Sequence, residues 1–344
     1  MLFIFNGRVH LVEGSVLWAS IGATIYCSVN DGATWSKKFK LDIAVKDRLY
    51  SLTRLSRRLF RKDVNHIIRM NDDYLAIVGF GFVYFYCTSS NQISNYYKIF
   101  GSRPLSVCVF NNILVYGEYK SNVKRSPINL IGVDRYAGSK VIYTFKNVRH
   151  IHGVHYDRFD NALWVTTGDR DNESTIWKMN SLIEEPVSIV TGSQQSRAVQ
   201  LLFEKKNVYY GTDTPLEKNY VYSINRSTHK IKKIFYVHSS IFYGCSFNKM
   251  HYLASVCEPS DINDIKYSRV YKFNDDSIDS RDGNVLIRIK KDIFPMKLFQ
   301  YGQINFPYGS ESGNFLYITP MSLVGDQKTY QIKINSTKMA HDNE

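Results

Sequence analysis

The sequence has no apolar run approaching the roughly 20 residues of a membrane-spanning helix. Its amino terminus, MLFIFNGRVHLVEG, has no basic segment before the apolar run and no small-residue cleavage site, so it does not resemble a signal peptide. Proline is also scarce, with 8 among 344 residues. We therefore expect a protein without a transmembrane segment, in which proline seldom interrupts regular structure.

Paired cysteines are missing as well. The five cysteines are an odd number, lie mostly inside apolar runs and form no CxxC pair. This pattern is typical of buried free thiols in a reducing compartment rather than of a disulfide framework or a metal site. Together with the missing signal segment it favours the cytoplasm, although secretion stays open.

The formal net charge of +13 predicts a surface that attracts polyanions such as nucleic acid, anionic lipid or acidic polysaccharide. Solubility alone is the competing explanation of the charge. No RNA- or DNA-binding motif is present, so no nucleic-acid partner is expected.

The chain is rich in aromatic residues, with 25 Tyr and 20 Phe, and short aromatic and β-branched runs favour strands. One clear apolar run recurs along the chain, and in the middle of the chain the recurrence is every roughly 39 to 50 residues, as for propeller blades of four antiparallel strands. These runs begin near Val16, Tyr74, Ile113, Leu163, Val208, Tyr252 and Phe315. The pattern predicts one all-β domain over 1–344, a seven-bladed β-propeller with six blades as the alternative. The strand LFIF near the amino terminus is expected to close the ring by pairing with the last blade.

Four of these units share a second pattern, in which a basic, His or Tyr residue opens one run and a carboxylate closes the next. The instances are Arg103 with Glu118, His150 and His152 with Asp169, Arg197 with Asp213, and Tyr243 with Glu258. In a blade of alternating strands, the loop entering the first strand and the loop leaving the second lie on the same face. The pattern therefore predicts one polar funnel.

We expect catalytic groups among Glu118, Asp169, Asp213, His152 and Tyr243, and substrate-binding groups among Arg103, Arg149, His150, Arg197, Glu258 and Tyr301. A carboxylate after a strand is also common as a turn residue or cap, which is the structural alternative. Two histidines and Asp169 offer the ligand types of a divalent metal. A His–carboxylate hydrogen bond is commoner, so no metal and no cofactor is predicted.

An insertion at about 46–62, KDRLYSLTRLSRRLFRK, places leucines at helical spacing among several arginines. Such a basic amphipathic stretch could contact a membrane surface or a polyanion peripherally. The alternative is a helix that packs its leucine face on the propeller.

Residues 28–35, SVNDGATW, resemble the Asp-box S-x-D-x-G-x-T-W, a structural turn between the third and fourth strands of a blade, with Asn30 in place of the usual Asp. The stretch 117–213 (GEY, RHIHGV, LWVTTGDRDNES, GSQQSRAV, YYGTDTP) resembles the core of sialidase-like, or BNR-repeat, glycosyl hydrolases. The resemblance implies a propeller in a glycan context. Sialidases resemble one another in three clamping arginines, a Tyr–Glu pair and an Asp acid/base. This implies Arg103, Arg149 and Arg197 as clamps, Tyr243 or Tyr301 as the phenol, and the four carboxylates above as the acids. The family's R-I-P segment is missing.

Three functions remain open. The favoured one is glycoside hydrolysis or transfer on an acidic oligo- or polysaccharide, which needs two carboxyl groups flanking the bond. A polysaccharide lyase would use His150 or His152 as base, Tyr243 as acid and Arg197 to neutralise the uronate. A propeller that binds a glycan or a protein without catalysis is the third. The sequence leaves the oligomeric state undetermined.

Overall fold

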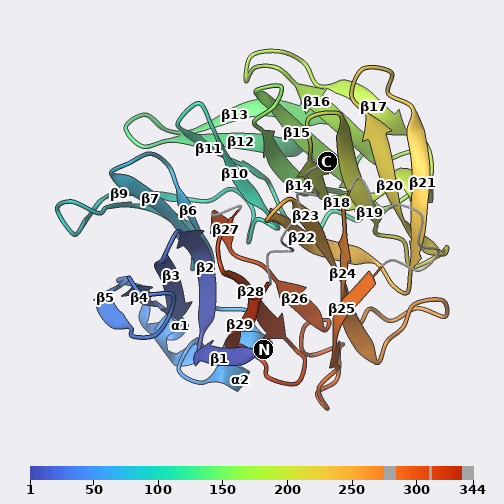
Figure 1. Ribbon diagram of the computed structural model, residues 1–344. Coiled ribbons are helices and arrows are strands. Elements are labelled where there is room, and N and C mark those ends of the chain that lie inside the picture. The colour runs from blue at the N-terminus through green and yellow to red at the C-terminus, as the bar shows by residue number, and fades with distance from the viewer. Residues whose placement is uncertain (275–283, 310–311, 335–344) are drawn as a thin grey trace, which may run out of the picture.

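The computed structural model describes residues 1–274, 284–309 and 312–334, which form a ring of seven antiparallel sheets (Figure 1). Every sheet contributes four strands to the ring in sequence order, apart from the sheet that joins the two chain ends. The predicted seven-bladed β-propeller is confirmed, and the six-bladed alternative is excluded.

The strands follow one another from the inside to the outside of each blade. Blade 1 consists of β2 (Arg8–Glu13), β3 (Val16–Ile21), β4 (Thr24–Ser28) and β5 (Ser36–Lys40). Blade 2 consists of β6 (Val64–Arg69), β7 (Tyr74–Gly79), β8 (Phe82–Cys87) and β9 (Gln92–Lys98). Blade 3 consists of β10 (Val107–Phe110), β11 (Ile113–Gly117), β12 (Ile128–Asp134) and β13 (Gly138–Phe145). Blade 4 consists of β14 (His150–Asp157), β15 (Ala162–Gly168), β16 (Thr175–Met179) and β17 (Val187–Thr191). Blade 5 consists of β18 (Ala198–Phe203), β19 (Asn207–Thr212), β20 (Asn219–Asn225) and β21 (Ile231–Val237). Blade 6 consists of β22 (Ile241–Phe247), β23 (Met250–Ser255), β24 (Tyr267–Phe273) and β25 (Asn284–Lys290). Blade 7 combines β26 (Gln303–Asn305), β28 (Phe315–Met321) and β29 (Thr329–Lys333) with β1 (Leu2–Phe5).

The hydrophobic core lies between the blades. All seven residues of β15 are buried, and alternate side chains leave a strand on opposite faces. Leu163 and Val165 accordingly pack towards blade 3, whereas Trp164 packs towards blade 5. Seven such clusters are found among the described residues, one for each pair of adjacent blades, so the core itself forms a closed ring.

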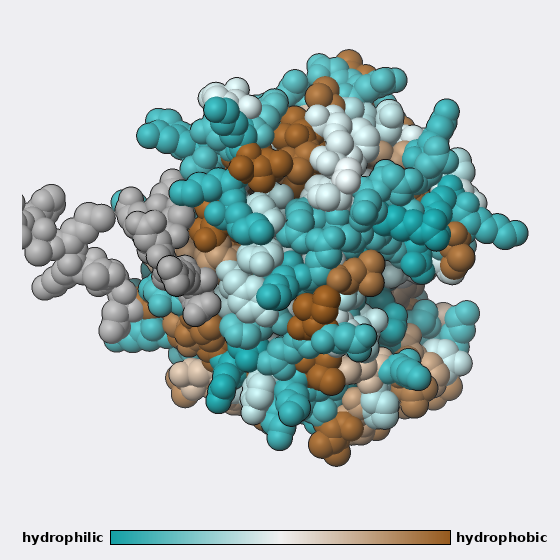
Figure 2. Space-filling model, turned by 90° about the vertical axis from the view of Figure 1, so that its right-hand side faces the viewer, coloured by the Kyte–Doolittle hydropathy of each residue, from teal (hydrophilic) through white to brown (hydrophobic). Residues whose placement is uncertain are grey.

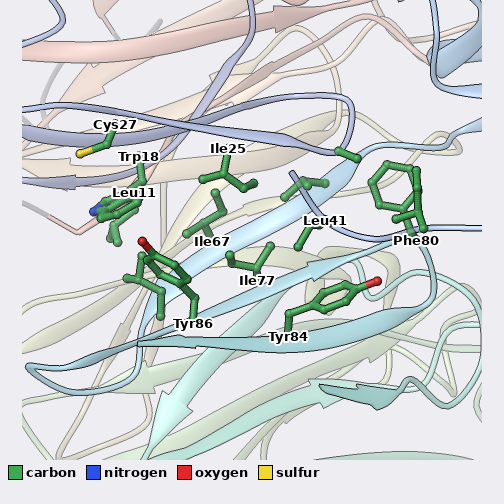
Figure 3. Packing of buried hydrophobic residues seen from close by; sticks show 14 residues of the cluster. Leu11, Trp18, Ile25, Cys27, Leu41, Ile67, Ile77, Phe80, Tyr84 and Tyr86 are labelled. Carbon is green, nitrogen blue, oxygen red and sulfur yellow. The ribbon is translucent and has the colours of Figure 1, made fainter. Parts of the chain in front are cut away.

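Figure 3 shows the interface between blades 1 and 2. Ile25 of β4 points from one sheet towards Ile67 of β6 and Ile77 of β7 on the other. Trp18 and Tyr86 meet edge to face, with ring centroids 5.9 Å apart. The alternation of branched and aromatic residues in these strands is thus explained by blade packing.

The ring is closed by the strand LFIF, as expected. β1 pairs antiparallel with β29 and becomes the outermost strand of blade 7, so the two chain ends share one sheet (Figure 1). The turn at 28–35 holds this strand, because Trp35 donates through Nε1 to the carbonyl of Ile4 at 3.0 Å and packs its ring on Phe5.

The turn itself has the geometry expected of the Asp-box. The hydroxyl of Ser28 accepts from the amide of Gly32 at 3.0 Å, and Asn30 accepts from the amide of Thr34 at 2.9 Å. Gly32 has a φ of 84°, where a side chain would be strained. Asn30 therefore fills the turn position that Asp usually occupies.

Outer strands present basic side chains. Figure 2 shows the outside of the ring on the right-hand side of Figure 1, where hydrophilic side chains cover most of the surface and hydrophobic ones form small groups. Lys232 and Lys233 of β21 and Arg288 and Lys290 of β25 belong to such edge strands. Charged residues on an edge discourage pairing with another chain.

All five cysteines are free; four are buried and Cys245 is partly buried. Within the described residues, no helix is long and apolar enough to span a membrane. The polar stretch 259–267 is expected to be a loop, and residues 259–266 are one, whereas Tyr267 already begins β24.

The insertion between blades 1 and 2 forms two short helices, α1 (Val45–Tyr50) and α2 (Arg54–Phe60), instead of one. Thr53 caps α2, and its preference for this position explains the break between them. The leucine face points away from the propeller. The alternative in which this face packs on the propeller is therefore wrong. Leu52 is 70% exposed, whereas Arg58 is only 2% exposed.

Replacing Trp35 with Ala should loosen the ring closure. Loss of the hydrogen bond and of the packing on Phe5 is expected to cost about 2 kcal/mol of unfolding free energy, less than for a fully buried Trp. Thermal unfolding measures this as a lower Tm. The matched control is Val29→Ala in the same turn, since Val29 is 67% exposed. Equal Tm values for both variants would contradict the closing role of Trp35.

Candidate functional site

The predicted funnel is present as one cavity of about 550 Å³. The face on which it opens carries the loops that enter first strands and leave second strands, and we call it the funnel face. His150 opens β14 and Arg197 directly precedes β18, while Asp169 and Asp213 directly follow β15 and β19. Ten of the eleven predicted site residues line this cavity, namely Arg103, Arg149, His150, His152, Asp169, Arg197, Asp213, Tyr243, Glu258 and Tyr301.

Glu118 is the exception, and the expectation that it lines the funnel is wrong. It does follow β11 directly, but its carboxylate accepts from the side chain of Asn129 at 2.9 Å and pairs with Lys120 at 2.9 Å. Glu118 also accepts a hydrogen bond from the backbone amide of Asn129, so its carboxylate holds the start of β12. This is the structural alternative of a carboxylate that closes a turn.

His152 owes its position to a β-bulge. In the pairing of β14 with β15, Ile151 lies opposite Thr167 and Gly153 opposite Thr166, which leaves His152 as the extra residue. Bulges redirect side chains and are common beside functional sites. Gly168 completes this arrangement, because a Cβ there would lie 3.3 Å from Cγ of Arg197 and 3.4 Å from Cε1 of His152.

Asp169 is the centre of a charged cluster. Its carboxylate accepts from Nε2 of His152 at 3.1 Å and pairs with Arg149 at 3.1 Å and Arg197 at 3.5 Å. Burial opposes ionisation of Asp169, but the hydrogen bond from His152 and the charge of Arg197 outweigh it and hold its pKa well below the usual range. Asp169 is therefore a carboxylate at any pH near neutrality.

Glu258 lies in the opposite situation. Burial, followed by the charge of Asp213, raises the pKa of Glu258 to about 7, although the hydroxyl of Ser240 donates to it at 2.9 Å. Burial also raises the pKa of Asp213, against the opposing charge of Arg197, whose Nε donates to it at 3.2 Å. The cavity thus holds Asp169, whose pKa is lowered, together with Glu258, whose pKa is raised to about 7.

His150, His152 and Asp169 have ligand atoms within 4.8 Å of one another, a spacing that a divalent cation could use. Arg149 and Arg197 already neutralise the same carboxylate. Burial lowers the pKa of His150 to about 4, so this ring is neutral at pH 7 and available as an acceptor. The cluster therefore combines an acceptor histidine with a carboxylate bound by cations.

Three further cations stand apart from this cluster. Among the described residues, Arg8, Arg61 and Arg103 have no carboxylate within ion-pair distance, and Nε of Arg8 is buried without a hydrogen-bond partner. Burial and the charge of Arg61 lower the pKa of Arg103, and Tyr243 lies close enough to Arg8 and Arg103 to interact with both charges. We call Arg8, Arg61 and Arg103 the arginine group.

Two members of the arginine group are absent from the predicted site. Arg8 opens the first strand of blade 1, as Arg197 precedes that of blade 5, so the repeat pattern carried a signal for it. Arg61 ends the insertion and has no counterpart in the other blades, so periodicity carries no signal for it. Arg57 and Arg58 of α2 line the cavity as well.

A short strand near the centre of the ring contacts His66, which lines the cavity. β27 (Tyr308–Gly309) pairs parallel with β2, and the hydroxyl of Tyr308 contacts Nδ1 of His66 at 2.8 Å (Figure 1). Burial and then the charge of Arg8 lower the pKa of His66 to about 3, so its ring is neutral. Its Nε2 donates to the carbonyl of Pro104 at 3.1 Å, which fixes its orientation.

The chain matches no protein-family model, and no curated protein gives a significant match. Among solved structures it is similar to a chain of a crystal structure of the mitotic checkpoint complex, with 13% identity, a TM-score of 0.59, and coverage of 97% of this chain and 93% of that one. It is also similar to the extracellular domain of a putative one-component system from B. thetaiotaomicron, with 12% identity and a TM-score of 0.60. That match covers 98% of this chain but 40% of the other. At such identities the likeness concerns the fold.

Replacing Glu258 with Gln should change how stability depends on pH. A raised carboxyl pKa contributes stability at low pH that is lost as pH rises through about 7. Between pH 5 and pH 8 the wild type should therefore lose about 2 kcal/mol relative to the variant. Thermal unfolding at both pH values measures this difference. Glu185→Gln, an exposed carboxylate, is the control, and parallel pH curves for wild type and Glu258→Gln would contradict the raised pKa.

Proposed function

We propose that this propeller binds an acidic oligo- or polysaccharide in its funnel and hydrolyses or transfers a glycosidic bond there. The observation that carries the proposal is the combination in one cavity of Glu258, whose pKa is raised, Asp169, whose pKa is lowered, and the arginine group. Two carboxyl groups with diverging pKa values are what glycoside hydrolysis requires. The resemblance of residues 117–213 to sialidase-like propellers supports the glycan context.

The charge of the cavity supports an anionic ligand. Its lining contains eight Arg and Lys residues against four Asp and Glu residues. Arg149 pairs with Asp169, and Arg197 pairs with Asp213. Within the part of the chain that the structure describes, the arginine group has no carboxylate at ion-pair distance. A carboxylate, sulfate or phosphate on a sugar would accept charge-assisted hydrogen bonds from it and relieve the mutual repulsion of Arg61 and Arg103.

The proposed roles follow from protonation. Glu258 donates its proton to the leaving oxygen as general acid. The resulting carboxylate then takes a proton from the water or acceptor hydroxyl that bonds to the anomeric carbon. Asp169 stays ionised and stabilises the positive charge that develops on the sugar ring, while Arg197 orients it through a contact at 3.5 Å. The arginine group binds the anionic substituent, which positions the sugar relative to both carboxyl groups.

A lyase is the second candidate, and one observation favours it. His150 is neutral at pH 7, and burial raises the pKa of Tyr243, so an acceptor ring and a protonated phenol occupy the same cavity as arginines. Elimination from a uronic acid would use His150 as base, Tyr243 as acid and Arg103 or Arg8 to neutralise the carboxylate. Only this route gives an unsaturated product.

A screen against sialylated, uronate-containing and sulfated glycans tests the proposal, with reducing ends and ultraviolet absorbance both recorded. New reducing ends without absorbance are expected. Glu258→Gln should lower kcat by about 100-fold or more while binding is retained, because it removes the general acid. Arg103→Ala should instead weaken binding by about 10- to 100-fold.

Glu118→Gln is the matched control, since this carboxylate lies outside the cavity. It should leave turnover and affinity unchanged. An unsaturated product would move the assignment to the lyase. Binding without turnover would identify a binding propeller and contradict the enzymatic part, and failure to bind every anionic glycan would contradict the whole proposal.

A further inference from the structure

In the amphipathic insertion the polar face contacts the propeller and the apolar face is exposed, which is the reverse of an ordinary packed surface helix. Arg58 of α2 pairs with Asp292 at 2.7 Å and lies over the rings of Phe294 and Phe299. Arg57 donates to Gln327 at 2.9 Å. The polar face of α2 is therefore fixed to the propeller, and its leucines are left outside.

The exposed apolar side chains continue onto the loops that α2 contacts. The set consists of Val45, Leu49, Leu52, Leu55, Leu59 and Phe60 of the insertion, Ile293 and Leu298 of the loop before β26, and Val324 of the loop before β29. We call this set the apolar collar. Its three segments touch one another, because α2 contacts Asp292 in one loop and Asp326 in the other. Ordinary surface residues of this size are exposed singly, so a set gathered in contacting segments indicates an interaction surface.

The collar borders the mouth of the funnel. The insertion and the 291–300 loop connect an outer strand to the next inner strand, and the 322–327 loop joins the second and third strands of blade 7. All three therefore lie on the funnel face. Arg57 and Arg61 of the insertion and Met296 and Phe299 of the loop line the cavity itself.

Basic residues are interleaved with the collar. Residues 42–63 contain seven Lys and Arg residues against three Asp residues. Of the three acids, Asp47 is buried against Lys62 and Asp42 pairs with Arg48. Lys46, Arg61 and, in the neighbouring loop, Lys297 are exposed. The outward surface is thus apolar and positive together.

We propose that the funnel face docks on an anionic membrane surface through the apolar collar. Leucine and phenylalanine side chains enter the boundary between headgroups and acyl chains, while the surrounding Lys and Arg residues bind anionic headgroups. A second copy of the chain is a less favourable partner, because a symmetric contact would place the same positive segments against each other. Docking turns the mouth of the funnel to the membrane, so its ligands are presented from that surface. This proposal does not depend on the chemistry assigned to the cavity.

Cosedimentation with vesicles tests this docking. The full chain should bind vesicles of equal parts phosphatidylcholine and phosphatidylserine and should bind pure phosphatidylcholine vesicles much more weakly. Replacing Leu52 and Leu55 together with Asp should weaken binding at least about tenfold, since it removes apolar insertion and adds repulsion. Lys46→Gln should weaken it by about fivefold. Both leucines are exposed, so an unchanged Tm confirms that the variants fold.

Ile183→Asp is the matched control. Ile183 is 90% exposed, but it lies between the third and fourth strands of blade 4, on the face opposite the funnel. Its vesicle binding should equal that of the wild type. Absence of binding, equal binding to neutral vesicles, or equal loss in the control would overturn the proposal. A dimer seen in sedimentation equilibrium and dissociated by Leu52→Asp with Leu55→Asp would also overturn the proposal, because the collar would then join two copies.

Discussion

The pairing of β1 with β29 is the interaction on which the rest of the molecule depends. It places both ends of the chain in one sheet, so that blade 7 packs on blade 1 as every other blade packs on the next. A closed ring fixes the direction of each inner strand relative to the axis. The loops that carry Arg103, His150, Arg197 and Asp213 are thereby brought to one face, although they are far apart in the sequence.

Neighbouring charges and burial set the pKa values of the carboxyl groups on the funnel face. Asp169, surrounded by Arg149, Arg197 and His152, remains ionised, while burial and the charge of Asp213 raise the pKa of Glu258 to about 7. One polar atom in each of Arg8, Arg149, His152 and Asp213 is buried without a hydrogen-bond partner among the described residues. Such unpaired groups cost folding free energy, and proteins tolerate them mainly where a ligand or a reaction uses them.

The repeat pattern in the sequence was sufficient to predict the number of blades, the closing strand and most of the funnel, because each depends on positions that recur with the blade. It failed for Glu118, where the same position serves a turn through Asn129. It also failed for Arg61, which an insertion contributes outside the repeat. Periodicity cannot show which face of a short helix is buried either. In α2 the ion pair of Arg58 with Asp292 and its contacts with two phenylalanine rings decide the orientation, and these partners lie over two hundred residues away.

The bulge at His152 and the protonation of Glu258 are likewise properties of the assembled ring. A histidine two residues from another on a strand is expected to share its face, and both histidines do line the cavity. The bulge in β14 that leaves His152 as an extra residue is, however, a property of the assembled sheet. The pKa of Glu258 depends on burial and on Asp213 of a different blade, neither of which is visible in the local sequence. Sequence patterns therefore predicted most of the residues that line the cavity, and tertiary packing shifts the pKa values of its carboxyl groups.

A crystal structure of the protein with a bound uronate-containing oligosaccharide would test the central claim most directly. The account predicts a sugar inside the funnel, with its carboxylate within hydrogen-bond distance of Arg103 or Arg8 and a glycosidic oxygen facing Glu258. An oligosaccharide bound on the outer strands, or one in the funnel whose carboxylate avoids the arginine group, would contradict it.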